Sequence, residues 1–494
     1  MDLSALAPTL LVGAAIVLLA VLGVRFAGKL GVSGLLLYLL IGLIGGTFFP
    51  ALKFDQPELA TVLGYSALVI ILAQGGLTTR MSKLQPVLAP SIVLASVGVI
   101  VSIAVVAIPL VLLGVELRTA LLLGTVLAAT DAAAVFSVLR KLRVNDRLRT
   151  VLEAEAGFND APVAVIVSVI VSPAFSEGPL WQIPLLIVLE LVVGAAIGVA
   201  MGYFARWALP RLALPAVGLY PIAALAFLVL AFGAADIVHV SGFMAVYLAA
   251  VIIGSSDEIP HRRSIIGFAD ALAWIAEIGL FIMLGLLATL SELPSALWLA
   301  GLALVFLVFL GRPLAALVSL LPFRFPMRDI AFVGGAGLRG AVPIVFAAIP
   351  LGAAIPGASV VFNATMVVVI ILLLVQTPVL PWLGRVLKVE SSDSADELEV
   401  ESAPLDGMKA IVLGIDVPTT SHLVGTFVVE LGLPKGAVVS LVIRDGEAIA
   451  PDANTRIRAG DRLVVVTTAA ARKEAEARIR TIAQHGRLAD WKLD

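Results

Sequence analysis

Three groups of polar residues lie inside long apolar stretches of this sequence. They are Thr130-Asp131, Glu155 with Asn159-Asp160, and Arg339 between Leu338 and Gly340. A charged side chain at membrane depth costs at least about 2.5 kcal/mol even on lenient insertion scales, so such a residue normally serves an ion, a proton or an opposite charge. These groups therefore indicate the binding and release of a small cation.

Asp160 is the residue we expect to carry that chemistry. On a helix, Glu155 and Asn159 share a face, with Asp160 one position round. Arg339 is the one basic residue that the sequence places in the hydrophobic interior, and we expect Glu155 to form a structural ion pair with it. Asp160 is then free to titrate, because burial favours the protonated carboxyl whereas a bound cation favours the carboxylate.

Competition between a proton and a cation at one carboxylate is the basis of exchange. A single titrating charge, with the neutral Asn159 in place of a second acid, predicts one proton for one monovalent cation. For Asp131, two roles stay open: contact with the ion, or capping of a broken helix end. We expect a transporter rather than an enzyme.

The composition is that of a polytopic membrane protein. Of 494 residues, 60% are hydrophobic and only 14% are charged, and the mean hydropathy is +1.09, far above that of soluble globular proteins. The chain has no cysteine, which excludes disulfides and thiolate metal sites. The stretch from Leu10 to Val24 runs on into Arg25 without a cleavage pattern, which predicts a retained first span.

We expect an all-α membrane region with thirteen spans, because about 20 apolar residues are needed to cross a bilayer. Lys and Arg near span ends stay cytoplasmic, and an N-terminus outside with a cytoplasmic C-terminus leaves only Lys53 and Arg118 in outer loops. The predicted span centres are residues 17, 40, 66, 100, 128, 162, 194, 226, 247, 277, 305, 340 and 370. The predicted inner-loop bases are Arg25, Lys29, Arg80, Lys83, Arg140, Lys141, Arg143, Arg147, Arg149, Arg206, Arg211, Arg262, Arg263, Arg312, Arg324, Arg328, Arg385 and Lys388.

The fifth and twelfth predicted spans contain the helix breaks. Glycines and Pro343 around Arg339 loosen the twelfth span, which is tolerated at depth only where the backbone is buried in protein or lines a wet cavity. Two broken helices in opposite halves match a transporter built from inverted repeats. Glu190, Glu277 and Asp270 are further acids in predicted spans; we expect local hydrogen-bonded roles for the first two and a solvated position for Asp270.

A soluble region follows the predicted membrane domain, residues 1–388. Residues 389–404 are rich in acids and predict a linker. Residues 405–484 predict a small α/β domain, with strands at Lys409–Ile415, Val438–Arg444, Glu447–Ala450 and Asp461–Thr467, and helices at His422–Leu433 and Ala469–Gln484. Asp445-Gly446 between two of these strands is a hairpin signal. Residues 485–494 form a tail.

The three polar groups together resemble the monovalent cation:proton antiporters, in the branch with an Asn-Asp pair that includes bacterial sodium/proton antiporters and animal sodium/proton exchangers. The resemblance extends over residues 5–388 and includes Gly42-Leu43-Ile44-Gly45 and Gly75-Gly76-Leu77. The tail resembles the C-terminal domain of regulators of potassium conductance (TrkA-C), through His422-Leu423-Val424-Gly425, Leu431-Gly432-Leu433-Pro434, Ile443-Arg444-Asp445-Gly446, Pro451 and Ala459-Gly460-Asp461. This pairing is typical of the potassium/proton antiporter subgroup.

The resemblance implies specific roles. Asp160 would be the ion and proton carboxylate, Thr130 and Asp131 would line the site and contact the transported cation, and Asn159 would steady it. Two positions depart from the family: Ala156 stands where relatives often have serine, and Gln74 where many have an acid. The loss of the hydroxyl at Ala156 shifts coordination towards water or backbone oxygens.

The resemblance also implies a homodimer in the inner membrane that contributes to pH homeostasis, with no cofactor apart from the transported K⁺ or Na⁺ and H⁺. A nucleotide, an ion or another small-molecule regulator on the C-terminal domain stays open, and membrane lipid rather than nucleic acid is the expected partner. K⁺ is the favoured cation, with Na⁺ second. A ligand-gated cation channel and a mere sensor platform stay open as different classes of function, although no repeated filter sequence of a channel is visible.

Overall fold

The computed structural model describes residues 11, 13–15, 17–23, 33–49, 53–131, 134–135, 144–173, 175, 182–256, 258–337, 339–389, 400–405, 410–418, 421–444, 446–468 and 470–486. The chain divides into two compact units, Met1–Val389 and Glu390–Asp494. The predicted inner-loop bases at positions 25, 29, 140, 141 and 143, most of the acidic linker and the last eight residues lie outside the described residues.

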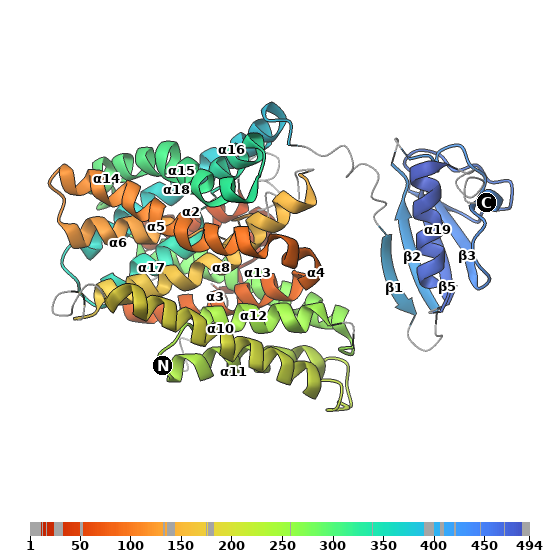
Figure 1. Ribbon diagram of the computed structural model, residues 1–494, viewed down its shortest axis with the longest axis horizontal. Helices are drawn as coiled ribbons and strands as arrows, with labels where there is room; N and C mark the ends of the chain where they lie inside the picture. The colour runs from red at the N-terminus through yellow and green to blue at the C-terminus, as the bar shows by residue number, and fades with distance from the viewer. Residues whose placement is uncertain are drawn as a thin grey trace. The chain divides into compact units, whose positions relative to one another are not determined.

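The regular elements that the structure describes in the first unit are all helices, joined by loops and turns (Figure 1). Its helices are α2 (Gly34–Phe48), α3 (Pro57–Thr78), α4 (Met81–Leu84), α5 (Leu88–Leu112), α6 (Leu117–Ala128), α8 (Asp146–Val171), α10 (Gln182–Ala208), α11 (Leu219–Ile237), α12 (Gly242–Ser255), α13 (Arg262–Leu287), α14 (Leu293–Phe306), α15 (Arg312–Leu320), α16 (Met327–Gly335), α17 (Ala341–Gly352) and α18 (Ala358–Val386). Short irregular turns are η3 (Gln85–Val87), η4 (Leu307–Gly311, a π-helix) and η5 (Leu321–Phe323).

The apolar helices confirm the membrane fold. Among the described residues, eight helical stretches are long and apolar enough to cross a membrane, and α2, α6, α12 and α17 are shorter apolar helices at other predicted positions. The first predicted span falls partly outside the described residues, and the count of thirteen crossings stays a prediction. With no water in a bilayer core, helices of this kind satisfy their own backbone groups.

Both predicted helix breaks are present. Helix α6 ends at Ala128, Ala129 is extended, and the chain is helical at Ala134 and Val135. Helix α16 ends at Gly335, and α17 begins at Ala341. Helix α8 lies beside these breaks and starts after Asn145, whose side chain accepts the Arg147 N–H, a standard helix N-cap.

The helices pack as two groups around the breaks. Helices α2, α3, α10, α11, α12 and α13 contact one another. Helices α5, α8, α15 and α18 pack against α6, α16 and α17, the described parts of the two interrupted spans, and α3 packs against α17 between the groups. At the end of α6 that lies away from its break, Arg118 donates to the last carbonyls of α8, Ile170 and Val171, at 2.8–3.0 Å. A cation at a helix C-terminus is electrostatically favourable, so this contact fixes α6 against α8.

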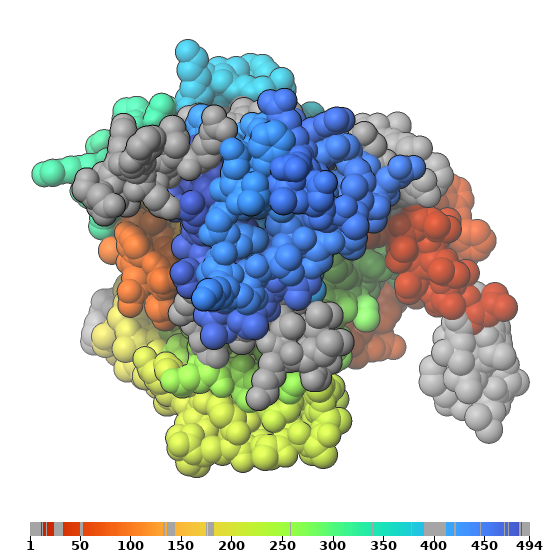
Figure 2. Space-filling model, turned by 90° about the vertical axis from the view of Figure 1, so that its right-hand side faces the viewer, coloured from red at the N-terminus to blue at the C-terminus, as the bar shows by residue number. Residues whose placement is uncertain are grey.

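The second unit is a five-stranded antiparallel sheet with one long helix, shown in blue in Figure 2. The strand order is β1-β2-β5-β3-β4. The strands are β1 (Val400–Leu405), β2 (Ala410–Asp416), β3 (Ala437–Arg444), β4 (Glu447–Ile449) and β5 (Arg462–Thr468), and the helix is α19 (Arg472–His485). Alternate residues of β5 are buried in a core that includes Leu463, Val465 and Ile479, the period-2 pattern of a strand with one covered face.

Two details of this unit differ from the sequence-based expectation. Residues 400–404, predicted as linker, form edge strand β1, which pairs with β2 from Val400 to Leu405. Edge strands tolerate acids and proline, here Glu401 and Pro404, so they resemble a polar linker. The helix predicted at His422–Leu433 is wrong, because turns and the short 3₁₀ segment η7 (Val428–Leu431) occupy this stretch. Gly425 and Gly432 take positive φ values there, which an α-helix does not allow.

Candidate ion-binding site

At each helix break, a charged side chain forms a hydrogen bond with the backbone of the other break. The Asp131 carboxylate after α6 accepts the Ala341 N–H at the start of α17 (2.6 Å), while Arg339 Nη1 donates to the Ala128 carbonyl at the end of α6 (2.7 Å). Each charge therefore meets the helix end of opposite partial charge. Gly340 makes the approach possible, because a Cβ at that position would overlap the Asp131 carboxylate.

Both carboxylate oxygens of Asp131 accept hydrogen bonds from backbone N–H groups. Its Oδ1 accepts the Ala134 N–H at 3.2 Å, and its Oδ2 accepts the Ala341 N–H. Of the two roles that the sequence leaves open for this residue, the hydrogen bonds match capping, and they do so for two half-helices at once.

Asn159 connects α8 to the break after α6. Its Oδ1 accepts the Thr130 N–H at 3.2 Å, and its Nδ2 donates to the Thr130 hydroxyl at 2.8 Å and towards the Ala128 carbonyl at 3.4 Å. The side-chain amide thus holds the extended backbone of Ala129-Thr130 in place. These contacts hold Thr130 beside Asn159, the residue that precedes Asp160 on α8.

Asp160 is buried without a matching partner. The residue is 1% exposed, and among the described residues its Oδ1 has no hydrogen-bond partner. An unpaired buried carboxylate is strongly disfavoured, so such a group binds a proton or a cation. Pro162 follows two residues later on α8; because proline has no N–H, it leaves the Phe158 carbonyl without its usual helical donor.

The predicted ion pair between Glu155 and Arg339 is wrong. Glu155 instead forms a two-pronged pair with Arg312, with Nη1 to Oε1 at 2.5 Å and Nη2 to Oε2 at 3.2 Å. Arg312 is 4% exposed, so its predicted position in an inner loop is wrong as well. A guanidinium matches a carboxylate in two parallel hydrogen bonds, and Arg339 is directed to the Ala128 carbonyl instead.

Arg312 is the residue that sequence reasoning missed. It follows the π-helical turn η4, and π-turns often mark functional positions because they shift the side chains that follow. Gly337, in the break before α17, leaves room for the Arg312 side chain, since a Cβ there would overlap its Nε. Arg312-Pro313 has the composition of a span end, so the sequence does not indicate that Arg312 is buried.

Arg339 is only partly satisfied. It is fully buried, and among the described residues its Nε and Nη2 have no hydrogen-bond partner. The buried charges of the membrane unit that the structure describes are thus three acids, Asp131, Glu155 and Asp160, and two bases, Arg312 and Arg339. With Asp160 ionised, this group carries one excess negative charge.

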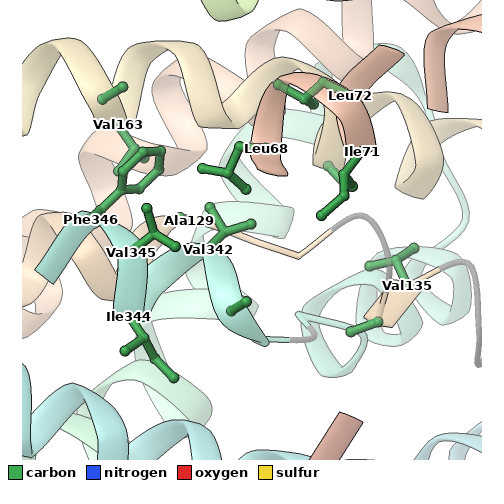
Figure 3. Packing of buried hydrophobic residues seen from close by; sticks show 14 of the residues in the cluster. Leu68, Ile71, Leu72, Ala129, Val135, Val163, Val342, Ile344, Val345 and Phe346 are labelled. Atoms are coloured by element: carbon green, nitrogen blue, oxygen red, sulfur yellow. The ribbon is translucent and has the colours of Figure 1, made fainter. Parts of the chain in front are cut away.

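Buried apolar side chains form a continuous core in the same helices. Leu68, Ile71 and Leu72 of α3 and Val342 and Val345 of α17 belong to this core, together with Ala129 (Figure 3). Ala156 of α8 is fully buried. Charge interactions are stronger in a buried setting of this kind than in water.

The other acids of the predicted spans lie outside this group. Gln74 Nε2 donates to Asp270 Oδ1 at 2.6 Å, so Asp270 is held by a side chain of α3 and is half-buried rather than freely solvated. Glu190 and Glu277 are also half-buried, on α10 and α13. None of these three carboxylates is among the buried charges around Asp160.

Two family models match the chain. The transmembrane sodium/hydrogen exchanger model matches residues 14–386, and the TrkA-C domain model matches residues 412–480. The chain belongs to the sodium/hydrogen exchanger family. The first match covers all the residues of the buried group, and the second runs from within β2 through β5 into α19 of the second unit.

Named relatives match almost the whole chain. The K(+)/H(+) antiporter NhaP of Alkalimonas amylolytica is 33% identical over 476 residues, 93% of this chain and 81% of the relative. The K(+)/H(+) antiporter NhaP2 of Shewanella sp. (strain ANA-3) is 33% identical over 477 residues, 94% of this chain and 82% of the relative. The solved sodium proton antiporter MjNhaP1 of Methanocaldococcus jannaschii at pH 8 shares the fold, with a TM-score of 0.66 and 22% identity, covering 76% of this chain and 97% of the other.

Proposed function

We propose that this protein is a secondary active antiporter that exchanges K⁺ for H⁺ by alternating access, with the proton and the cation competing at Asp160. In this proposal it is a homodimer in the inner membrane, with its N-terminus outside and its C-terminal domain in the cytoplasm. The family match and the K(+)/H(+) antiporter relatives support the type of transport and the choice of K⁺.

The charge of the buried group is the observation that carries the proposal. Arg312 neutralises Glu155. Asp131 and Arg339 have opposite charges, and each forms a hydrogen bond with a half-helix end. The remaining charge is that of Asp160, whose Oδ1 has no partner among the described residues. One proton or one monovalent cation makes the group neutral, whereas both or neither leaves a buried net charge, which is costly.

In this proposal the site residues have different parts. Asp160 supplies the charge, the Thr130 hydroxyl and the freed Phe158 carbonyl supply neutral oxygens, and Asn159 positions the Thr130 backbone. Asp131 acts as the cap of the two half-helices rather than as a direct ligand. Because Ala156 supplies no oxygen, water completes the shell of the cation.

Exchange in reconstituted vesicles tests the proposal. Proton movement driven by K⁺, Na⁺, Rb⁺ and Li⁺ gradients is compared for the unaltered chain, Asp160→Asn and the control Glu190→Gln, which neutralises a half-buried acid outside the site. We expect at least about a 100-fold loss in Asp160→Asn and near-normal exchange in Glu190→Gln. Exchange that persists in Asp160→Asn, or is lost only in a chain stopped after Lys388, contradicts the assignment.

Exchange of Na⁺ for H⁺ by the same site is the second candidate. The shared fold with MjNhaP1, a sodium proton antiporter, favours it. Comparison of the four cations in the same vesicles separates the two candidates. A channel would pass the cation without obligatory proton counterflow, and voltage-dependent reversal would contradict one proton for one cation.

A further inference from the structure

The end of α10 carries an unusual surface. Along most of its length α10 has an exposed apolar face, as expected for a helix that contacts lipid chains. Its last turns instead present the exposed aromatic residues Tyr203, Phe204 and Trp207. Phe204 and Trp207 stack with ring centres 5.9 Å apart. Tyrosine and tryptophan gather where a span meets the headgroup level, so this end marks the membrane boundary.

A hollow opens beside these rings. Its volume is about 480 Å³, and it is lined by Tyr203, Arg206, Trp207, Pro210, Arg211 and Glu258. The chain where α10 ends and α11 begins forms part of the outer surface of the membrane unit (Figure 2, yellow-green). The hollow therefore lies at the boundary between lipid and water rather than in the ion site.

The charges in the hollow have both signs. Arg206 Nη2 lies 3.2 Å from Glu258 Oε2, and 69% of the Glu258 side chain is exposed. The Arg211 guanidinium lies over the Trp207 ring, 4.8 Å from its centre, and its Nη1 donates to the Trp207 carbonyl at 2.7 Å. A guanidinium has five N–H donors, so Arg211 keeps donors for an anion while Trp207 holds it in place.

We propose that this hollow binds the headgroup of an amine-bearing phospholipid of the phosphatidylethanolamine type. The phosphate contacts Arg211 and Arg206, since guanidinium groups bind phosphate with charge-assisted hydrogen bonds. The ammonium contacts Glu258, which only accepts hydrogen bonds when ionised. The acyl chains lie along the exposed apolar face of α10. A purely anionic headgroup leaves Glu258 facing a negative charge, which is why the zwitterionic class is favoured.

Native mass spectrometry of the purified full-length chain tests this site. The protein is exposed to equal amounts of phosphatidylethanolamine, phosphatidylcholine and phosphatidylglycerol, and the retained lipid is measured. We expect preferential retention of phosphatidylethanolamine, reduced about 3- to 10-fold in Arg211→Gln, because the contacts are partly exposed. Glu258→Gln, which removes the carboxylate that lines the hollow, is expected to shift the preference towards phosphatidylglycerol.

Arg324→Gln is the matched control, because Arg324 belongs to another loop that is predicted to face the same side. It should retain lipid like the unaltered chain. Equal retention in Arg211→Gln and the unaltered chain overturns the site, and a preference for phosphatidylglycerol in the unaltered chain overturns the amine class. Displacement of the lipid by soluble phosphoethanolamine at similar concentration would overturn the lipid source and show a free metabolite site instead.

Discussion

Both units of this protein contain buried aspartates, and Asp461 and Asp160 differ in what surrounds them. In the C-terminal unit, Asp461 accepts hydrogen bonds from Arg444 Nε and Nη2 (2.9 and 2.8 Å) and from the Arg458 N–H (2.7 Å). Burial by itself raises the pKa of Asp461, but these donors lower it overall below its ordinary value. In the membrane unit, Asp160 is equally buried but lacks a partner at Oδ1 among the described residues.

The difference separates structural from functional carboxylates. A buried carboxylate that is fully hydrogen-bonded stays ionised and stabilises one arrangement. One that lacks partners must take up a proton or a cation, and so responds to the concentration of both. Glu155 belongs with Asp461, because Arg312 occupies both of its oxygens.

The largest effect on stability is expected where an ion pair is broken. Glu155→Gln leaves the Arg312 charge buried and unpaired, which costs about 3–5 kcal/mol. Asp160→Asn leaves no charge unpaired and should be stable or slightly more stable than the unaltered chain. Thermal unfolding of both variants in the same detergent measures the contrast.

The double variant Glu155→Gln with Arg312→Gln serves as the control for this prediction. It removes both charges and should recover much of the lost stability. If Asp160→Asn destabilises the protein as much as Glu155→Gln, the distinction between structural and functional carboxylates fails.

The pH dependence of the C-terminal unit is the next largest effect. Because the pKa of Asp461 is lower in the folded state than its ordinary value of 3.8, its contribution is present above that value and is lost as the pH falls through the folded pKa. At neutral pH, Asp461→Asn should cost about 1–3 kcal/mol. Urea unfolding of residues 390–494 between pH 7 and pH 2 measures the pH dependence and the loss of stability. If the free energy of unfolding falls as steeply with acid in Asp461→Asn as in the unaltered chain, Asp461 does not have this role.

These contrasts also explain what the sequence predicts well and what it does not. The spans, both helix breaks and most strands follow from apolar length, glycine and proline positions and turn signals, which are local. The partner of Glu155 is not local: Arg312 is 157 residues away, and its burial depends on the turn η4. A polar edge strand such as β1 likewise shows its structure only through its partner β2.

A moderate effect is expected at the cap between the two breaks. Asp131→Asn keeps the shape but directs an N–H₂ group at the Ala134 or Ala341 N–H, so one backbone donor loses its acceptor, at a cost of about 1–2 kcal/mol. We expect slower exchange with a smaller change in apparent cation affinity, because in the proposed site Asp131 positions the half-helices rather than binding the ion. Initial rates over a range of K⁺ concentrations test this, and a large rise in half-saturating K⁺ at an unchanged maximum rate would show direct contact with the ion.

The smallest effect is expected at Ala156, one helical turn before Asp160. Ala156→Ser adds a hydroxyl within the buried site, which offers the cation a protein oxygen in place of water and is nearly isosteric. An added hydroxyl that contacts the ion should lower the half-saturating cation concentration by about 2- to 5-fold, of the order of 1 kcal/mol or less. The smaller, more strongly hydrated Na⁺ should gain more than K⁺, because it benefits most from a fixed polar ligand.

Vesicle exchange with K⁺ and Na⁺ measures this ratio of affinities. Ala154→Ser, on the same helix two residues earlier, is the control for the added oxygen alone. Ala156→Ser could leave both affinities unchanged while Asp160→Asn abolishes exchange. The cation then lies on the other side of Asp160, towards Thr130, and its protein ligands come from the break after α6.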